Sequence, residues 1–239
     1  MSADWVSILM IAAVLGGCAG APCAEGPVVV AFGDSITLGS GVKPEESYPA
    51  QLQALLREQT AVADLKVVNA GVGGNTVTQG LTRLEADVLA HQPRAVLIGF
   101  GMNDSVMVAA GQPRVPLETF SATLTEVVRR VQATGAQALL ATVTPVLEEY
   151  YFERHPRDWY PDPEGLQPQL QRYSDAIRSV AGQTGATLVD LSCLKAAVHL
   201  RTPQNSGARD GVHPTPAGYA VMARAYAEAL RALPWTGKP

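Results

Sequence analysis

Ser35 has the sequence surroundings of a nucleophile. It lies in the stretch VVVAFGDSITLGSG (28–41), directly after an apolar run and behind Gly33 and Asp34. A helix starting here would place free backbone N–H groups and the positive end of its dipole beside the serine oxygen, where both favour negative charge. Such a nucleophile also needs a base and donors for an oxyanion. The alternative is that Ser35 only caps the helix.

His213 is the histidine best placed to serve as that base. It stands in DGVHPTPAGY (210–219), three residues after Asp210. This spacing spans one turn, so the carboxylate can accept a hydrogen bond from Nδ1 and leave Nε2 free to face the serine. An acidic turn before a capped helix is the alternative. The other histidines fit surface or helix-end positions: His91, His155 and His199.

Two further segments offer donors for an oxyanion. The segment NAGVGGNT (69–76) is rich in glycine, which lets a backbone N–H approach a ligand closely. The segment GMND (101–104) contains Asn103, whose side-chain NH₂ is a neutral donor. Taken singly, the first is equally consistent with a tight turn and the second with a turn closed by an Asn side chain.

The elements that must position these residues alternate along the chain. Apolar segments poor in charge predict buried strands at 27–32, 65–70, 95–100, 138–143 and 186–191. Apolar residues at helical spacing predict helices at 47–59, 77–92, 117–135, 170–185 and 216–233. Right-handed crossovers between such units imply a five-stranded parallel sheet with helices on both faces. Every candidate residue then follows the carboxyl end of a strand, at one edge of the sheet.

Four blocks in this order resemble the GDSL, or SGNH, hydrolase family. The matching positions are Gly33-Asp34-Ser35, a glycine of the second block, Gly101-Met102-Asn103-Asp104, and Asp210-Gly211-Val212-His213. The resemblance covers about Val28 to Leu230; the first block departs from the family pattern only in having Ile36 where leucine is usual. It implies a three-layer α/β/α sandwich of flavodoxin-like type.

The resemblance also implies a role for each matched residue. Ser35 would be the nucleophile, His213 the general base and Asp210 its orienting acid. The backbone N–H groups of Ser35 and Gly74, with the side chain of Asn103, would form the oxyanion hole. Gly74 is favoured because it stands five residues after Asn69, although the neighbouring glycines at 71 and 73 stay open.

The reaction expected from these roles is two-step acyl transfer through an acyl-enzyme, with no metal and no cofactor. The expected substrate is a short-chain ester, above all an acetyl ester of a carbohydrate or a similar polar alcohol. A lipid ester hydrolase of the lysophospholipase or thioesterase type is the first alternative. A non-catalytic ligand-binding protein on the same scaffold is an alternative of another class.

Residues 1–26 are interpreted as a leader and tether, and residues 27–239 as the hydrolase domain. The leader holds an apolar run of signal-peptide length, and Leu15-Gly16-Gly17-Cys18 resembles a bacterial lipobox. We therefore expect export with lipid attachment at Cys18, which would be the protein's one link to a membrane. Plain secretion and an uncleaved extension are the alternatives. The net charge of −4, without clustered Lys and Arg, argues against a nucleic-acid partner.

Two features outside the four blocks carry expectations of their own. Cys193 follows the last predicted strand and is expected to be a small buried residue; pairing with Cys23 would require the tether to fold back. The long connection 144–166 carries five aromatic residues among charges: Tyr150, Tyr151, Phe152, Trp159 and Tyr160. These aromatics suit stacking on a sugar ring, or they simply pack the connection onto the domain.

Overall fold

A five-stranded parallel sheet forms the centre of the protein. The computed structural model describes residues 26–58, 65–160 and 165–233. The strands are β1 (Val28–Gly33), β2 (Lys66–Gly71), β3 (Ala95–Gly99), β6 (Gln137–Ala141) and β7 (Thr187–Val189), in the spatial order β2-β1-β3-β6-β7. The chain moves outward from β1 to β2 and then returns to place β3 on the other side of β1. The carboxyl ends of β1 and β3 therefore flank the point where the strand order reverses.

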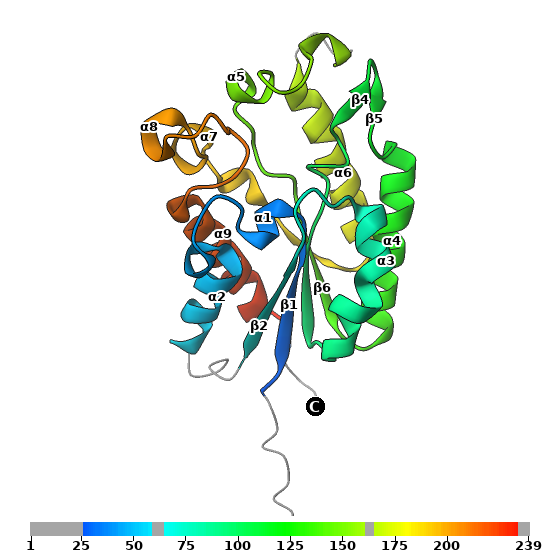
Figure 1. Ribbon diagram of the computed structural model, residues 1–239. Coiled ribbons are helices and arrows are strands. Elements are labelled where there is room, and N and C mark those ends of the chain that lie inside the picture. Colours follow the sequence, from blue (N-terminus) through cyan, green and yellow to red (C-terminus); the bar gives the residue numbers. More distant parts are fainter. Residues whose placement is uncertain (1–25, 59–64, 161–164, 234–239) are drawn as a thin grey trace, which may run out of the picture.

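Helices cover both faces of the sheet, which makes the fold a three-layer α/β/α sandwich. In Figure 1, α2 (Tyr48–Arg57) and α9 (Pro216–Arg231) lie on the left of the sheet. The other face carries α3 (Val77–Asp87), α4 (Leu117–Ala133) and α6 (Leu166–Thr184). The short helices α1 (Ser35–Leu38), α5 (Glu148–Tyr151), α7 (Ala196–His199) and α8 (Pro203–Ser206) lie toward the carboxyl ends of the strands (Figure 1).

Alternate strand residues supply two separate cores. Val29, Ala31 and Leu97 belong to the core that α2 and α9 complete, whereas Val30 and Phe32 belong to the core beneath α3, α4 and α6. Since side chains of a strand point alternately to its two faces, a strand buried on both sides reads as an unbroken apolar run. This is why VVVAF predicted a central strand correctly.

The helices differ from the sequence expectation at their ends. Helix α3 ends at Asp87, before the expected end at residue 92. The chain then continues as the 3-10 turn η2 (Leu89–His91), which Gln92 closes in a left-handed conformation. Helix α6 begins at Leu166, earlier than expected, because Glu148 Oε1 accepts hydrogen bonds from the first N–H groups of the helix, those of Leu166 and Gln167. A distant side chain thus extends this helix.

A short hairpin between the third and fourth strands of the sheet was not expected from the sequence. It consists of β4 (Met107–Ala109) and β5 (Gln112–Pro113). Strands this short leave no periodic pattern in a sequence.

Cys193 is exposed, and the expectation that it is buried was wrong. It ends the 3-10 turn η4 (Leu191–Cys193), and the neighbouring Leu191 and Leu194 supply the buried side chains there. Because β7 is an edge strand, the turn that follows it has one side in solvent. The other edge of the sheet is β2. Cys23 lies outside the described residues, as do Cys18 and the rest of residues 1–25 of the expected leader.

The connection 144–166 packs largely on itself. Tyr150, Tyr151 and Tyr160 are at most 8% exposed, and the hydroxyls of Tyr151 and Tyr160 are hydrogen-bonded at 2.6 Å. The N–H of Gly111, in the hairpin, donates to the carbonyl of Trp159, a residue of the 3-10 turn η3 (Arg157–Trp159). These three tyrosines therefore pack the connection onto the domain and are not free to stack on a sugar ring. Phe152 and Trp159 stay partly exposed.

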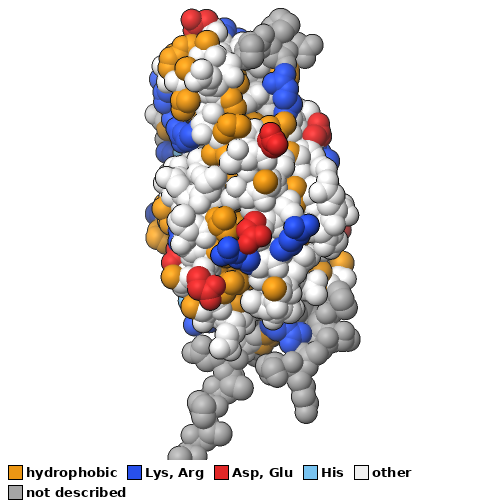
Figure 2. Space-filling view, turned by 90° about the vertical axis from the view of Figure 1, so that its right-hand side faces the viewer, with side chains coloured by type: hydrophobic (Ala, Val, Ile, Leu, Met, Phe, Trp, Pro, Cys, Tyr) orange, Lys and Arg blue, Asp and Glu red, His pale blue; other side chains and the backbone are white. Residues whose placement is uncertain are grey.

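The α4 side of the molecule carries a mixed charge. Figure 2 shows acidic and basic side chains interspersed on this face, and Arg130 and Glu126 form an ion pair of 2.7 Å on α4. Across residues 26–58, 65–160 and 165–233, no helix has both the length and the hydropathy needed to cross a bilayer.

Candidate active site

Ser35 is the first residue of α1 and lies partly exposed at the carboxyl end of β1. The cap of this helix is Asp34, whose Oδ1 accepts a hydrogen bond of 2.9 Å from the N–H of Ile36. The alternative that Ser35 caps the helix is therefore wrong. With the capping function assigned to its neighbour, the Ser35 hydroxyl is available to another partner, and its own N–H belongs to the first turn, which has no intrahelical acceptor.

That partner is His213, which approaches from the loop before α9. Its Nε2 lies 2.9 Å from Ser35 Oγ, although the two residues are far apart in the sequence. On the other side of the imidazole, Nδ1 lies 3.1 Å from Asp210 Oδ1 and 3.0 Å from Oδ2. The three residues form a continuous chain from carboxylate to imidazole to hydroxyl. Such a chain can carry a proton away from the serine as the oxygen attacks an electrophile.

Asp210 is held by many donors besides the imidazole. The backbone N–H groups of Val212 and His213 donate to Oδ1 at 3.1 Å, and Arg201 Nη1 donates to Oδ2 at 3.2 Å. Burial raises the pKa of this carboxyl, but the hydrogen bonds and charge of His213, with the backbone donors, outweigh burial and lower the pKa to about 2. Asp210 is therefore ionised at neutral pH and orients the imidazole.

Asn103 lies across from the triad, in the block that follows β3. Its Nδ2 donates to Asp34 Oδ2 and to the carbonyl of Asn75, both at 3.1 Å. The next residue, Asp104, is fully buried and accepts from the N–H groups of Val77 and Gly101, at 2.8 and 3.0 Å. Asp104 thereby ties the block to the start of α3. The Asn103 amide is thus fixed in one orientation, and an oxyanion would share one of its two hydrogens.

Two buried carboxyls next to Asn103 have raised pKa values. Burial raises the pKa of Asp34 to about 7, and Asp104 adds repulsion, even though the Ile36 N–H and Asn103 lower it. Burial likewise raises the pKa of Asp104 to about 6, although the N–H groups of Val77 and Gly101 oppose this shift. Asp34 holds Asn103 and the N–H of Ile36 in place, and Asp104 holds the backbone at Val77 and Gly101.

The structure distinguishes Gly71, the last residue of β2, from Gly74 in the loop that follows. A Cβ on Gly71 would lie 2.2 Å from the backbone nitrogen of Leu38, so this glycine is required for α1 to pack against β2. Gly74 has φ of +77°, and a Cβ there would meet nothing within 4 Å. It adjoins Asn75, whose carbonyl accepts from Asn103. Gly74 is therefore the glycine whose peptide lies beside Asn103 in a conformation that favours glycine.

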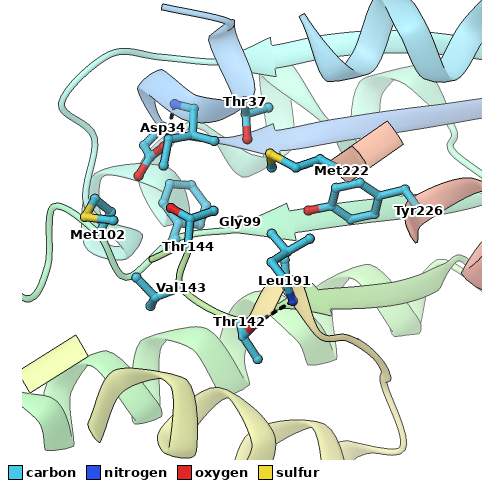
Figure 3. A pocket seen from close by; sticks show the side chains of 13 residues that line it. Asp34, Thr37, Gly99, Met102, Thr142, Val143, Thr144, Leu191, Met222 and Tyr226 are labelled. Carbon is cyan, nitrogen blue, oxygen red and sulfur yellow. Dashed lines mark hydrogen bonds between the residues drawn. The ribbon is translucent and has the colours of Figure 1, made fainter. Parts of the chain in front are cut away.

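A small cavity of about 30 Å³ lies next to the nucleophile block. In Figure 3 the side chains of Asp34, Met102 and Thr144 gather at one end of it, and those of Met222 and Tyr226 lie at the other. Its lining is mostly apolar. Thr144 is 3% exposed, and its Oγ1 has no hydrogen-bond partner among the described residues. The cavity has room for a group of the size of a water molecule or a methyl.

Comparison with known proteins places the chain in a family. Residues 31–221 match the model of the GDSL-like Lipase/Acylhydrolase family. The chain belongs to this family. An uncharacterized lipoprotein of Bacillus subtilis, YqeF, is 28% identical over 192 residues, covering 78% of each chain. An acetylxylan esterase of Geobacillus stearothermophilus is 27% identical over 215 residues, covering 84% of this chain and 93% of its own.

One solved structure is similar over nearly its whole length. The acetyl xylan esterase AlAXEase superposes with a TM-score of 0.66 at 27% identity, covering 85% of this chain and 99% of its own. As in other proteins with this strand order, the site of this GDSL-like hydrolase lies where the order reverses. The resemblance inferred from four short blocks is thus confirmed for family and fold.

Three residues at the site of this GDSL-like hydrolase were missed as candidates by sequence reasoning. Asp34 holds Asn103, and Arg201 contacts Asp210 Oδ2. Arg154 donates to the carbonyl of Asp210 at 2.9 Å. Asp34 stands beside the serine and was recognised only as part of its block. Nothing in the local sequence connects either arginine with Asp210, because their contacts depend on how the loops fold.

Proposed function

We propose that this protein is a serine esterase that hydrolyses carboxylic esters through an acyl-enzyme. The observation that carries the proposal is the hydrogen-bonded chain from Asp210 through His213 to a partly exposed Ser35. Membership of a family described as lipases and acylhydrolases supports the same reaction class. A ligand-binding protein would not require a base within 2.9 Å of a serine hydroxyl.

Both steps of the proposed reaction use the triad in the same geometry. His213 Nε2 takes the Ser35 proton while Oγ attacks the carbonyl carbon of the ester. The resulting imidazolium is stabilised by the ionised Asp210. As the tetrahedral intermediate collapses, the carbon–oxygen bond to the alcohol breaks, and His213 passes its proton to the leaving oxygen. Water then attacks the acyl-enzyme with His213 again as base, which releases the acid and restores Ser35.

The developing oxyanion is assigned to three donors: the N–H groups of Ser35 and Gly74 and the side chain of Asn103. Donors that are fixed before the reaction are effective because they need no reorientation as charge appears. Asn103 meets this requirement through its bonds to Asp34 and Asn75.

The finer part of the proposal concerns the substrate, for which we infer a short-chain ester, above all an acetyl ester of a carbohydrate. The similarity of the chain, over most of its length, to an acetylxylan esterase supports this inference. Aromatic stacking on the sugar would fall to the partly exposed Trp159, since the tyrosines of the connection are buried and Arg157 lies over the ring of Phe152.

A series of p-nitrophenyl esters from acetate to decanoate tests the acyl preference. We expect kcat/KM to be highest for acetate and to fall steadily as the chain lengthens, as for an enzyme that acts on acetyl esters. An optimum at eight or more carbons would overturn the short-chain assignment and favour a lipid ester. Xylan with and without acetyl groups then tests the alcohol: acetate release from the acetylated polymer is the supporting result.

Labelling with a fluorophosphonate probe separates esterase from binding protein. Only a serine activated by its neighbours reacts with such a probe, so labelling at Ser35 supports the proposal and a lack of labelling favours the binding protein.

We further propose that the protein is exported and attached to a membrane through a lipid on Cys18. The similarity to a lipoprotein of Bacillus subtilis supports export, and the lipobox-like sequence supports the attachment site. We expect Cys18→Ser to move the protein from the membrane fraction to the soluble fraction, or to stall its processing. Cys193→Ser is the matched control, because this exposed cysteine lies in the folded domain. Unchanged membrane partition of Cys18→Ser places the anchor elsewhere.

A further inference from the structure

The arginine at position 201 connects the segments that carry the triad. Its backbone N–H donates to the carbonyl of His213 at 2.9 Å, and its carbonyl accepts from the N–H of Gly211 at 2.8 Å. A bridge between Leu200 and Pro214 continues this pairing. Arg201 is therefore fixed in register with the loop that presents Asp210 and His213.

The side chain of Arg201 lies between the acid and the loop that follows the nucleophile. Nη1 donates to Asp210 Oδ2 at 3.2 Å, with 20% of the arginine side chain and 10% of the aspartate side chain exposed. The guanidinium passes over Gly41, in the loop after α1. Gly41 has φ of +86°, which favours glycine, and a Cβ there would lie 1.9 Å from Nη1, so a side chain at this position would displace the guanidinium from where it lies.

We propose that Arg201 is a positioning residue of the triad, which holds Asp210 in place and keeps His213 available as a base. This inference rests on the proposed esterase function. The guanidinium occupies one lone pair of Oδ2 and so limits rotation of the carboxylate away from Nδ1. Its positive charge also balances part of the negative charge of Asp210, which lies directly against the imidazole; without the guanidinium that charge is left unopposed.

The charges that face His213 come from four parts of the chain. Asp210 lies on its own loop, Arg201 on the paired segment and Asp34 at the end of β1, where it interacts with His213 through charge. Arg154, from the 144–166 connection, lies 3.9 Å from Asp210 Oδ1, but half of its side chain is exposed and water screens its effect.

Tyr219, from α9, also faces Asp210 and Arg201. Burial raises the pKa of this tyrosine, which keeps its phenol neutral. Arg201 is thus the least exposed cation against the triad's acid.

The test compares the pH dependence of kcat/KM in wild type, Arg201→Gln and Arg201→Lys, with p-nitrophenyl acetate as substrate. We expect the acid limb of the Gln variant to move to higher pH by about one unit, as expected when a nearby unit charge is removed. The Lys variant keeps the charge and should restore most of this shift. The rate of fluorophosphonate labelling, measured over the same pH range, should move in parallel. A purely structural role would lower activity without moving the limb.

Arg178→Gln is the matched control, because Arg178 pairs with Asp190 and Asp175 at similar distances and is 34% exposed. Its acid limb should coincide with that of wild type. If the Gln variant does not fold, Arg201→Met, which keeps the apolar stem, takes its place. Coincident limbs for wild type and the uncharged variants overturn the role of Arg201 while leaving the esterase intact. Absence of ester hydrolysis and of Ser35 labelling in wild type overturns the proposed function itself.

Discussion

Replacing Ser35 with alanine is expected to lower kcat for ester hydrolysis by a factor on the order of 10⁴ to 10⁶. In the proposed mechanism this hydroxyl forms the acyl-enzyme, and the imidazole that activates it lies 2.9 Å away. His213→Ala should cost a similar factor. The double variant should be no worse than either single variant, because the two residues act as one unit.

The measurement is single-turnover and steady-state hydrolysis of p-nitrophenyl acetate, together with the melting temperature of each variant. Ser121→Ala is a matched control: its hydroxyl donates only to the carbonyl of Leu117, on the exposed side of α4. It should leave kcat within a factor of about two, as surface changes usually do. If Ser35→Ala retained a tenth of wild-type kcat in folded protein, the assignment of the nucleophile would be wrong.

Asn103→Ala carries the second largest expected effect, a fall in kcat of about 10² to 10³ with little change in KM. In the proposed mechanism the amide donates to an oxygen that becomes charged only in the transition state, so its loss should affect the chemical step more than substrate binding. The steady-state parameters of the folded variant provide the measurement. A change confined to KM would show instead that Asn103 binds the substrate in its ground state.

This substitution also has a cost in stability that must be separated from the effect on kcat. Asn103 Nδ2 donates to the buried Asp34, and a buried acceptor that loses its partner costs about 1–3 kcal/mol. The variant should therefore melt at a lower temperature, and its kinetics should be measured well below that temperature. Asn103→Asp, which keeps the size but removes the N–H donors, should lower kcat at least as much.

The sequence by itself determined the order of the five sheet strands along the chain and singled out Ser35, Asp210 and His213, which the structure brings together. Strands β1 and β3 are buried on both faces, and such burial gives an unbroken apolar run such as VVVAF. Asp210 and His213 are separated by one turn, so their contact is a local property of the chain. The positions of Ser35 and Asn103 directly after strands follow from the same pattern, because parallel strands bring their carboxyl ends to one edge.

The tertiary structure decided everything that depends on contacts between distant segments. The strand order β2-β1-β3-β6-β7 and the cap that Glu148 provides for α6 have no local signature. The same holds for Gly71, required by the approach of α1, and for Gly41, over which the Arg201 guanidinium lies. Burial of aromatic residues and exposure of Cys193 were also decided there, since an edge strand and a long connection can present either side to solvent.

The contacts of Arg201 show why this division arises. A carboxylate three residues before a histidine suffices to identify the pair, because one turn of backbone brings them together. Arg201, which accompanies this pair, is nine residues before Asp210, and its guanidinium lies over Gly41 in the loop after α1. Its place depends on two loops packing at the same edge of the sheet, and that packing is a property of the folded chain, not of residue spacing.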